Sequence, residues 1–265
     1  MKETTALNID CGTKTSLRIL SYNIQVGIGS VRASHYLTQS WKHIFPHSRN
    51  FNNLDRIAEL ISDYDIVGLQ ETDAGSLRTG FINLTEYLAD KGDFPFWYDQ
   101  TNRNLGQIAQ HSIGFLSKLK PVDVHEHKLP GFIPGRGAML IRYGRNDNPL
   151  VLILLHLALG KRARLAQLDY VADMVNQFEH VVVMGDMNCR PGSPEMDMLF
   201  NKTSLTEPIG EMHTFPSWRP YRNIDHILVT PALKVREVNV LNHSISDHLP
   251  IAMEIALPDN MNIIG

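Results

Sequence analysis

Residues 181–188 read VVVMGDMN, an apolar run that ends in two polar side chains. Four apolar residues in succession, bounded by turn-forming residues, predict a short and fully buried β-strand. Similar runs occur at residues 17–24, 66–69, 113–116, 138–143, 151–155, 224–229 and 251–255. The chain is therefore expected to be built around strands, several of them fully buried.

Between some of these runs the apolar period changes from that of a strand to that of a helix. Apolar residues recur on one helical face in residues 54–61 and again in residues 165–178. The turn GRNDN at residues 144–148 joins two predicted strands too closely for a crossover helix, and therefore predicts a hairpin. This pattern favours an α/β sandwich with two mixed sheets over a barrel of regular βα units.

The composition is that of a soluble globular protein and fits one domain over residues 1–265, with its core at about residues 17–257. The 265 residues include 25 Lys and Arg against 28 Asp and Glu, a formal net charge of −3, and 43% are hydrophobic. No repeat or linker divides the chain. The charge disfavours a protein that coats nucleic acid, because such binding relies on an excess of Lys and Arg. It is compatible with an enzyme that handles one phosphate at a time.

The cysteines and the apolar runs favour a cytoplasmic protein. Cys11 and Cys189 are far apart and form no CxxC pair, which predicts a reducing compartment. The first residues lack the apolar stretch of a secretory signal, and no apolar run approaches the roughly 20 residues that cross a bilayer. We expect no transmembrane segment, and the sequence indicates no obligate protein partner.

Two long segments, residues 29–52 and 72–110, show little periodicity and contain aromatic runs such as WKHIFPH at 41–47 and FPFWY at 94–98. Long irregular segments in a compact domain often bind ligands. Loops that are packed by their own aromatic side chains are an equally good interpretation. As binding loops, residues 29–52 and 94–103 would stack nucleobases or hold a lipid or inositol head group.

Polar side chains stand at the ends of six predicted strands, where ligand crevices form in open α/β sheets. They are Asn23, Glu71, His156, Asp186 with Asn188, Asp225, and Asp247 with His248. Any one of them alone is more often a turn residue, a helix cap or a hydrogen-bonded core group. Together they predict one shared site.

Five blocks of sequence carry a family resemblance. They are SYNI at residues 21–24, LQE at 69–71, GDMN at 185–188, IDHI at 224–227 and SDHLP at 246–250. In order and spacing they resemble the endonuclease/exonuclease/phosphatase family, which includes pancreatic-type deoxyribonuclease, apurinic endonucleases, neutral sphingomyelinases and inositol polyphosphate 5-phosphatases. The resemblance spans roughly residues 17–257. It implies a four-layer α/β sandwich of two mixed, mainly antiparallel sheets flanked by helices, and Mg²⁺-dependent hydrolysis of a phosphoester.

The resemblance also implies a metal site. Glu71 would be the principal Mg²⁺ ligand, with Asn23 and Asp247 close to the ion directly or through water. Carboxylate and amide oxygens suit Mg²⁺, which binds few protein ligands and keeps several waters, and Mn²⁺ is an alternative. Gln25 stands where apurinic endonucleases carry an Asp, which points away from that branch and weakens the case for two metal ions.

The same resemblance assigns catalytic roles. Asp186 would orient or deprotonate the attacking water, and Asn188 would bind the phosphate. His248 would hydrogen-bond the scissile phosphate or transfer a proton, with Asp225 setting its tautomer. His156 matches the second histidine of the deoxyribonuclease branch. Further candidates for substrate contact are Arg136 and His111, and with less support Lys161, Arg162 and Arg164.

The sequence therefore predicts a metal-dependent phosphoesterase of the phosphodiesterase type, acting on a nucleic acid or on a phospholipid or inositol-type head group. No HExxH zinc motif, GxSxG elbow or complete dinucleotide fingerprint competes with this interpretation. The alternative is a catalytically silent binding or scaffold protein that retains the fold. Loss of Glu71, Asp186 or His248 would have favoured it, but all three are present. The substrate and the choice between monoester and diester stay open.

Overall fold

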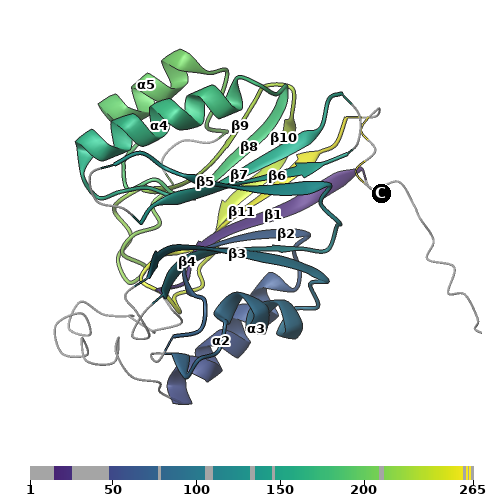
Figure 1. The fold of residues 1–265 in the computed structure, drawn as a ribbon, viewed down its shortest axis with the longest axis vertical. Coiled ribbons are helices and arrows are strands. Elements are labelled where there is room, and N and C mark those ends of the chain that lie inside the picture. Colours follow the sequence, from purple (N-terminus) through teal and green to yellow (C-terminus); the bar gives the residue numbers. More distant parts are fainter. Residues whose placement is uncertain are drawn as a thin grey trace, which may run out of the picture.

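The computed structural model of the chain describes residues 15–25, 48–76, 79–104, 110–131, 135–144, 147–208, 212–258, 261 and 263. Its elements form four layers, because two β-sheets face each other and each carries a pair of helices on its outer face (Figure 1). The predicted four-layer α/β sandwich is thus confirmed.

Each sheet is mixed and mainly antiparallel. The six-stranded sheet has the order β10 (Lys234–Val240), β11 (Ile251–Ala256), β1 (Ser16–Asn23), β2 (Ile66–Asp73), β4 (Gln110–Ser117) and β3 (Phe96–Asn104). The five-stranded sheet has the order β5 (Asp123–Lys128), β6 (Gly137–Tyr143), β7 (Leu150–His156), β8 (His180–Asp186) and β9 (Asp225–Val229). The pairs β1–β2 and β7–β8 are parallel, and the others are antiparallel.

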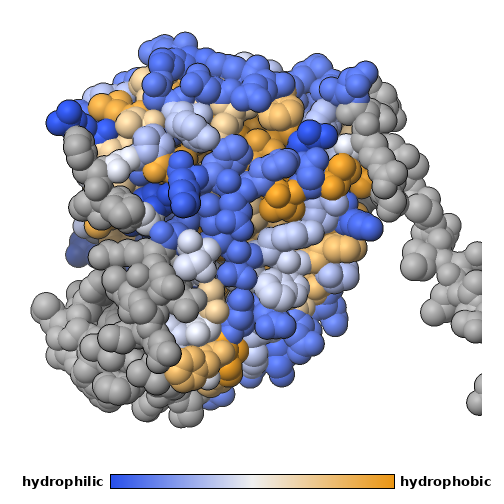
Figure 2. Space-filling model, in the orientation of Figure 1, coloured by the Kyte–Doolittle hydropathy of each residue, from blue (hydrophilic) through white to orange (hydrophobic). Residues whose placement is uncertain are grey.

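Three buried apolar clusters fill the spaces between the four layers. Helices α2 (Ser48–Ile61) and α3 (Leu84–Lys91) cover the six-stranded sheet, and α4 (Lys161–Val175) and α5 (Pro194–Lys202) cover the other (Figure 1). The outer surface over α4 and α5 is mainly hydrophilic in Figure 2, as expected of helices that bury their other face. Among the described residues, no helix is long and apolar enough to cross a membrane.

The eight predicted strands are all present, and the antiparallel pairing of β6 with β7 confirms the predicted hairpin. Strands β5 and β10 were not predicted, because both are sheet edges whose sequences, DVHEHK and KVREVNV, are rich in charge. Charged side chains on an edge strand discourage pairing with other chains and also break up the apolar run. Helices α3 and α5 were also not predicted, because they are too short for their apolar residues to show a clear helical period in the sequence.

The prediction that residues 72–110 form a long irregular segment is wrong. This segment contains the end of β2, all of α3 and β3, and the start of β4. Phe94 is buried, and Trp97 packs against the cluster between the six-stranded sheet and its helices. The aromatic run therefore belongs largely to the core. Of the other segment, residues 48–52 form the start of α2, and residues 29–47 lie outside the described residues.

A glycine next to the end of β8 sets the direction of the residues that follow. Gly185 has a φ of +139° and is paired with Leu155 of β7. A Cβ atom at this position would lie 2.0 Å from the carbonyl oxygen of Leu155, so a side chain does not fit unless β7 moves. The glycine thereby lets Asp186 lie beside His156, its partner in the parallel pair.

Replacement of Gly185 by alanine is expected to lower the free energy of unfolding by about 3 kcal/mol, because the methyl group collides with β7 and the positive φ is strained. Gly160→Ala is the matched control, since Gly160 has a φ of −87° and no atom lies within 4 Å of its Cβ position. We expect that change to cost less than about 1 kcal/mol. Urea unfolding followed by circular dichroism measures both values, and equal losses would contradict this account of Gly185.

Candidate active site

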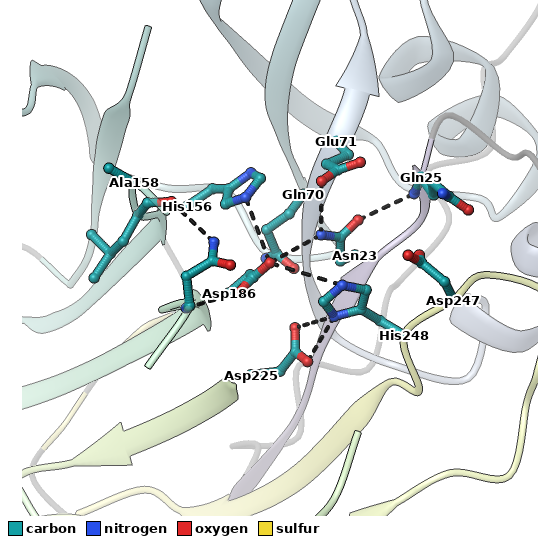
Figure 3. A network of polar contacts seen from close by, with 12 residues as sticks. Asn23, Gln25, Gln70, Glu71, His156, Ala158, Asp186, Asp225, Asp247 and His248 are labelled. Atoms are coloured by element: carbon teal, nitrogen blue, oxygen red, sulfur yellow. Dashed lines mark hydrogen bonds and ion pairs between the residues drawn. The ribbon is translucent and has the colours of Figure 1, made fainter. Parts of the chain in front are cut away.

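The structure brings the predicted strand-end residues together in one network of polar contacts that links the two sheets (Figure 3). The clearest link between the sheets joins β1 to β8, since Asn23 Nδ2 donates to Asp186 Oδ2 at 3.2 Å. The carboxyl ends of the two parallel pairs therefore meet in one polar centre. The predicted residues therefore lie near one another, and their roles stay predictions.

Asp186 lies in the middle of this centre. Its Oδ2 atom, which accepts from Asn23, lies 3.5 Å from His156 Nε2 and 4.0 Å from His248 Nε2. Its Oδ1 atom accepts the backbone N–H of Asn188 at 2.9 Å. One carboxylate oxygen thus faces two imidazoles and an amide, and the other oxygen holds the turn that follows β8 (Figure 3).

His248 is held by a carboxylate on the opposite side of its ring. Its Nδ1 atom lies 2.8 and 3.0 Å from the two carboxylate oxygens of Asp225. The hydroxyl of Thr214 donates to the same carboxylate, and the ring of Phe215 packs on the imidazole with centroids 4.8 Å apart. The Asp225 contact fixes the proton on Nδ1, so Nε2 is the atom that His248 presents to Asp186.

Burial and the neighbouring charges shift the pKa values of His248 and Asp186. Burial lowers the pKa of His248, but the carboxylates of Asp225, Asp186 and Asp247 together raise it to about 10. Burial and the Asp225 charge raise the pKa of Asp186 to about 7, against the opposing effect of His248. A carboxyl group with this pKa can accept a proton near neutral pH, and a protonated imidazole beside it can donate one.

An irregularity in the pairing of β2 sets the direction of the Glu71 side chain. The pairing of β2 with β4 shifts register between Leu69 and Thr72, and Glu71 has a φ of +55°. Bulges with a left-handed residue re-aim a side chain, and such strain is concentrated at functional sites. Here Glu71 faces Asn23, whose Nδ2 donates to Glu71 Oε1 at 3.3 Å (Figure 3).

The oxygen-bearing side chains of Asn23, Glu71 and Asp247 fit a divalent cation. Burial raises the pKa of Glu71, and the Asp247 charge raises it further, although His248, Asn23 and Arg136 oppose the effect. A cation between Glu71 and Asp247 would relieve the repulsion, and oxygen donors of this kind are those that Mg²⁺ prefers. The donor set therefore suits the ion that the family resemblance implies.

A second group, Asp186, Asp225 and His248, offers ligand atoms within 4.8 Å of one another. Its members are already engaged with each other, because His248 Nδ1 contacts both oxygens of Asp225, and Thr214 donates to that carboxylate. A cation here would have to replace the imidazole proton. The chemistry of this group suits proton transfer better than metal binding.

Asn188 ends the turn after β8 in a left-handed conformation, with a φ of +53°, which asparagine tolerates better than most residues. Its Nδ2 donates to the carbonyl oxygen of Leu157 at 3.1 Å. The Met187 N–H donates to the carbonyl of Ile224 at 2.9 Å. These bonds tie the turn both to the residue after β7 and to the residue before β9.

The remaining basic candidates differ in position. The charge of Arg136 opposes the rise in the pKa of Glu71. The backbone of His111 belongs to β4, and its side chain lies outside the described residues. The suggestion that Arg164 contacts phosphate is wrong, because Arg164 Nη2 pairs with Glu195 Oε1 at 2.7 Å and links α4 to α5. The other two candidates on the first turn of α4 are Lys161 and Arg162.

Sequence reasoning missed the residues that support His248 and the turn after β8. Thr214 and Phe215 lie in a segment without periodicity, so nothing in the sequence pointed to them. His226 is part of the IDHI block, but the sequence assigns a role there only to the neighbouring Asp225. Its ring contacts Glu207 and the carbonyl of Cys189, which lie in segments distant in sequence.

Residues 20–248 match the sequence profile of the Endonuclease/Exonuclease/phosphatase family. The chain therefore belongs to this family, whose members are phosphoester hydrolases. No curated protein sequence gave a significant match to the chain.

Solved bacterial structures share the fold at low sequence identity. A protein of this family from Bacteroides thetaiotaomicron has a TM-score of 0.69 and 18% identity, covering 92% of this chain and 98% of that one. A mannosyl-6-phosphatase from the same species has a TM-score of 0.65 and 18% identity, with coverages of 91% and 100%. Beta toxin from Staphylococcus aureus has a TM-score of 0.63 and 16% identity, with coverages of 89% and 99%. These similarities support the fold.

The pairing of His248 with Asp225 predicts an unusual titration of the metal-free protein. The pKa of His248 is raised from 6.5 to about 10, so the pair stabilises the folded state fully below pH 6.5 and loses this contribution as the pH rises through 10. In NMR titrations, the His248 ring of the wild type should stay protonated from pH 6 to pH 8. Asp225→Asn should lower the midpoint by about 2 pH units. A wild-type midpoint near 6.5 would contradict the pairing.

Proposed function

We propose that this chain is a divalent-cation-dependent phosphoesterase in which water attacks the phosphoester of a nucleic acid or of a phospholipid or inositol-type head group. The observation that carries the proposal is the placement of Asp186 Oδ2 within 4.0 Å of nitrogen atoms of Asn23, His156 and His248. The carboxylate of Asp186, a proton acceptor, thus lies next to two imidazoles, and Asn23 links it to Glu71. Membership of a phosphoester hydrolase family that is generally dependent on divalent metals supports the reaction class.

Asp186 orients the attacking water and accepts its proton. The pKa of Asp186, raised to about 7 by burial and by Asp225, suits a base that works near neutral pH. Asn188 is bound through its backbone N–H to the same carboxylate, so its side chain is fixed relative to the base. In the proposed reaction Asn188 contacts a phosphate oxygen.

As water adds to phosphorus, the P–O bond to the leaving group breaks, and His248 donates a hydrogen bond to the phosphate or a proton from Nε2 to the departing oxygen. Asp225 holds the Nδ1 proton and stabilises the imidazolium, so the ring cannot present the wrong nitrogen. His156 lies on the other side of Asp186 and supplies a second donor, with Nε2 at 3.5 Å from the carboxylate. The two histidines thereby neutralise charge on opposite sides of the same phosphate.

Glu71 is the principal ligand for Mg²⁺ or Mn²⁺, with Asn23 and Asp247 beside it. A cation bound there would polarise a phosphoryl oxygen and offset the charge that develops on it. The strained conformation of Glu71, with its φ of +55°, keeps the carboxylate aimed at this position.

Arg136 and His111 are proposed to contact the substrate. The net charge of −3 favours recognition of a local phosphate over binding along a polyanion. One structural neighbour is a mannosyl-6-phosphatase, so this fold serves a phosphomonoester in that protein, and the proposal covers monoesters as well as diesters. We place the enzyme in the cytoplasm, which fits the buried free thiol of Cys189.

Hydrolysis of p-nitrophenyl phosphate and bis-p-nitrophenyl phosphate tests the proposal. The wild type should be active with Mg²⁺ or Mn²⁺ and inactive with a chelator, and His248→Ala should lower kcat about 100-fold or more. His180→Gln is the matched control, because His180 is a buried histidine at the opposite end of β8, with Nδ1 at 3.0 Å from Asn148 Oδ1. Its kcat should stay within about twofold of the wild type.

Equal rates with and without chelator, or full activity of His248→Ala, would overturn the proposal. An inactive wild type on both compounds and on plasmid DNA, sphingomyelin, a phosphoinositide and a nucleotide would favour the alternative of a silent scaffold. Among active preparations, the substrate with the highest kcat/KM identifies the chemical class that the enzyme recognises.

A further inference from the structure

His226, the neighbour of Asp225 in β9, is a fully buried histidine with an acceptor at each ring nitrogen. Its Nδ1 lies 2.7 Å from Glu207 Oε1, and its Nε2 lies 2.9 Å from the carbonyl oxygen of Cys189. A carboxylate and a carbonyl both accept hydrogen bonds, so both nitrogens must carry a proton and the ring is an imidazolium. Although burial alone lowers the pKa of His226, Glu207 raises it overall, in agreement with the geometry.

The carbonyl that His226 binds belongs to the residue after the catalytic turn at residues 186–188. Met187 binds the residue before β9, and Asn188 binds the residue after β7, so the middle and the end of the turn are fixed from two sides. The hydrogen bond from His226 fixes Cys189, the residue that follows the turn. It therefore limits how far the left-handed Asn188 can relax.

The partner of His226 is anchored independently. Thr206 forms an isolated antiparallel bridge with Val229, through backbone hydrogen bonds of 2.8 and 3.0 Å in the two directions. This bridge holds Glu207, the next residue, against β9, where its side chain is 13% exposed. A buried ion pair has a desolvation cost that an apolar pair of the same shape would avoid. Its presence beside the catalytic turn indicates a role beyond packing.

We propose that His226, oriented by Glu207, is a positioning residue that holds Asp186 and Asn188 in their working arrangement through the carbonyl of Cys189. The inference rests on the proposed function, because it assumes that these two residues serve the reaction. His226 touches neither the substrate nor the cation. It acts through the backbone of the turn.

Two substitutions separate positioning from loss of the buried charge. In His226→Gln, the side-chain amide can reach the place of Nε2 and donate to the Cys189 carbonyl. In His226→Asn, the shorter amide matches Nδ1 and leaves that carbonyl without its donor. We expect both variants to be less stable than the wild type, but kcat to fall about 10-fold or more, at unchanged KM, only in His226→Asn. His226→Gln should stay within about threefold of the wild type, and His180→Gln is the control for a lost buried histidine.

A second readout does not depend on activity. Cys189 has a free thiol that is 4% exposed, so its alkylation under native conditions, measured by mass spectrometry of its peptide, reports opening of the turn. We expect alkylation to be about 10-fold faster in His226→Asn than in His180→Gln, with His226→Gln close to the wild type.

Equal kcat values and equal alkylation rates in His226→Asn and His226→Gln would overturn the inference and leave His226 a purely structural role. If the wild type itself is inactive, the proposed function fails, whereas the alkylation rates still decide whether His226 holds the turn.

Discussion

Four carboxylates, those of Glu71, Asp186, Asp225 and Asp247, meet at one end of the sandwich, and their mutual repulsion is the constraint on which the rest of the site depends. Asp225 is balanced by the imidazole of His248, whose pKa it helps to raise to about 10. Burial first, and the neighbouring carboxylates Asp225 and Asp247 second, raise the pKa values of Asp186 and Glu71, so the ionised form of each group is disfavoured in the protein alone. In the proposed enzyme, a cation bound at Glu71 offsets the negative charge of the carboxylates, and the two histidines offset the charge of the bound phosphate.

The fold holds these groups together through rigid elements. Two parallel strand pairs, one in each sheet, end at the same place, and the bond from Asn23 to Asp186 joins them. The side chains are aimed by backbone conformations with positive φ, at Glu71, Gly185 and Asn188. The buried clusters on both faces of the central strands hold these strained conformations. The arrangement of the site residues is thus a consequence of the tight packing of the strand residues that precede them.

Buried central strands and their polar ends could be predicted from sequence because both leave a local signal, a continuous apolar run followed by Asp, Asn, Glu or His. Three edge strands, β3, β5 and β10, left no such signal, because their sequences are charged or half polar. The aromatic run near Phe94 resembled a binding loop because composition does not reveal which side of a layer a residue faces. Arg164 and His226 form ion pairs with residues far away in the sequence, so their partners emerged only with the fold.

The central claim is that the charge of Glu71 is held in place for a cation. Thermal unfolding of the wild type and of Glu71→Gln, each with a chelator and with saturating Mg²⁺ or Mn²⁺, tests it directly. Because the pKa of Glu71 is raised in the folded state, its ionised form costs stability at neutral pH. Without metal, Glu71→Gln should therefore have a Tm at least as high as that of the wild type. Metal should raise the wild-type Tm by several degrees and leave the variant unchanged. An equal rise in both proteins would contradict the account.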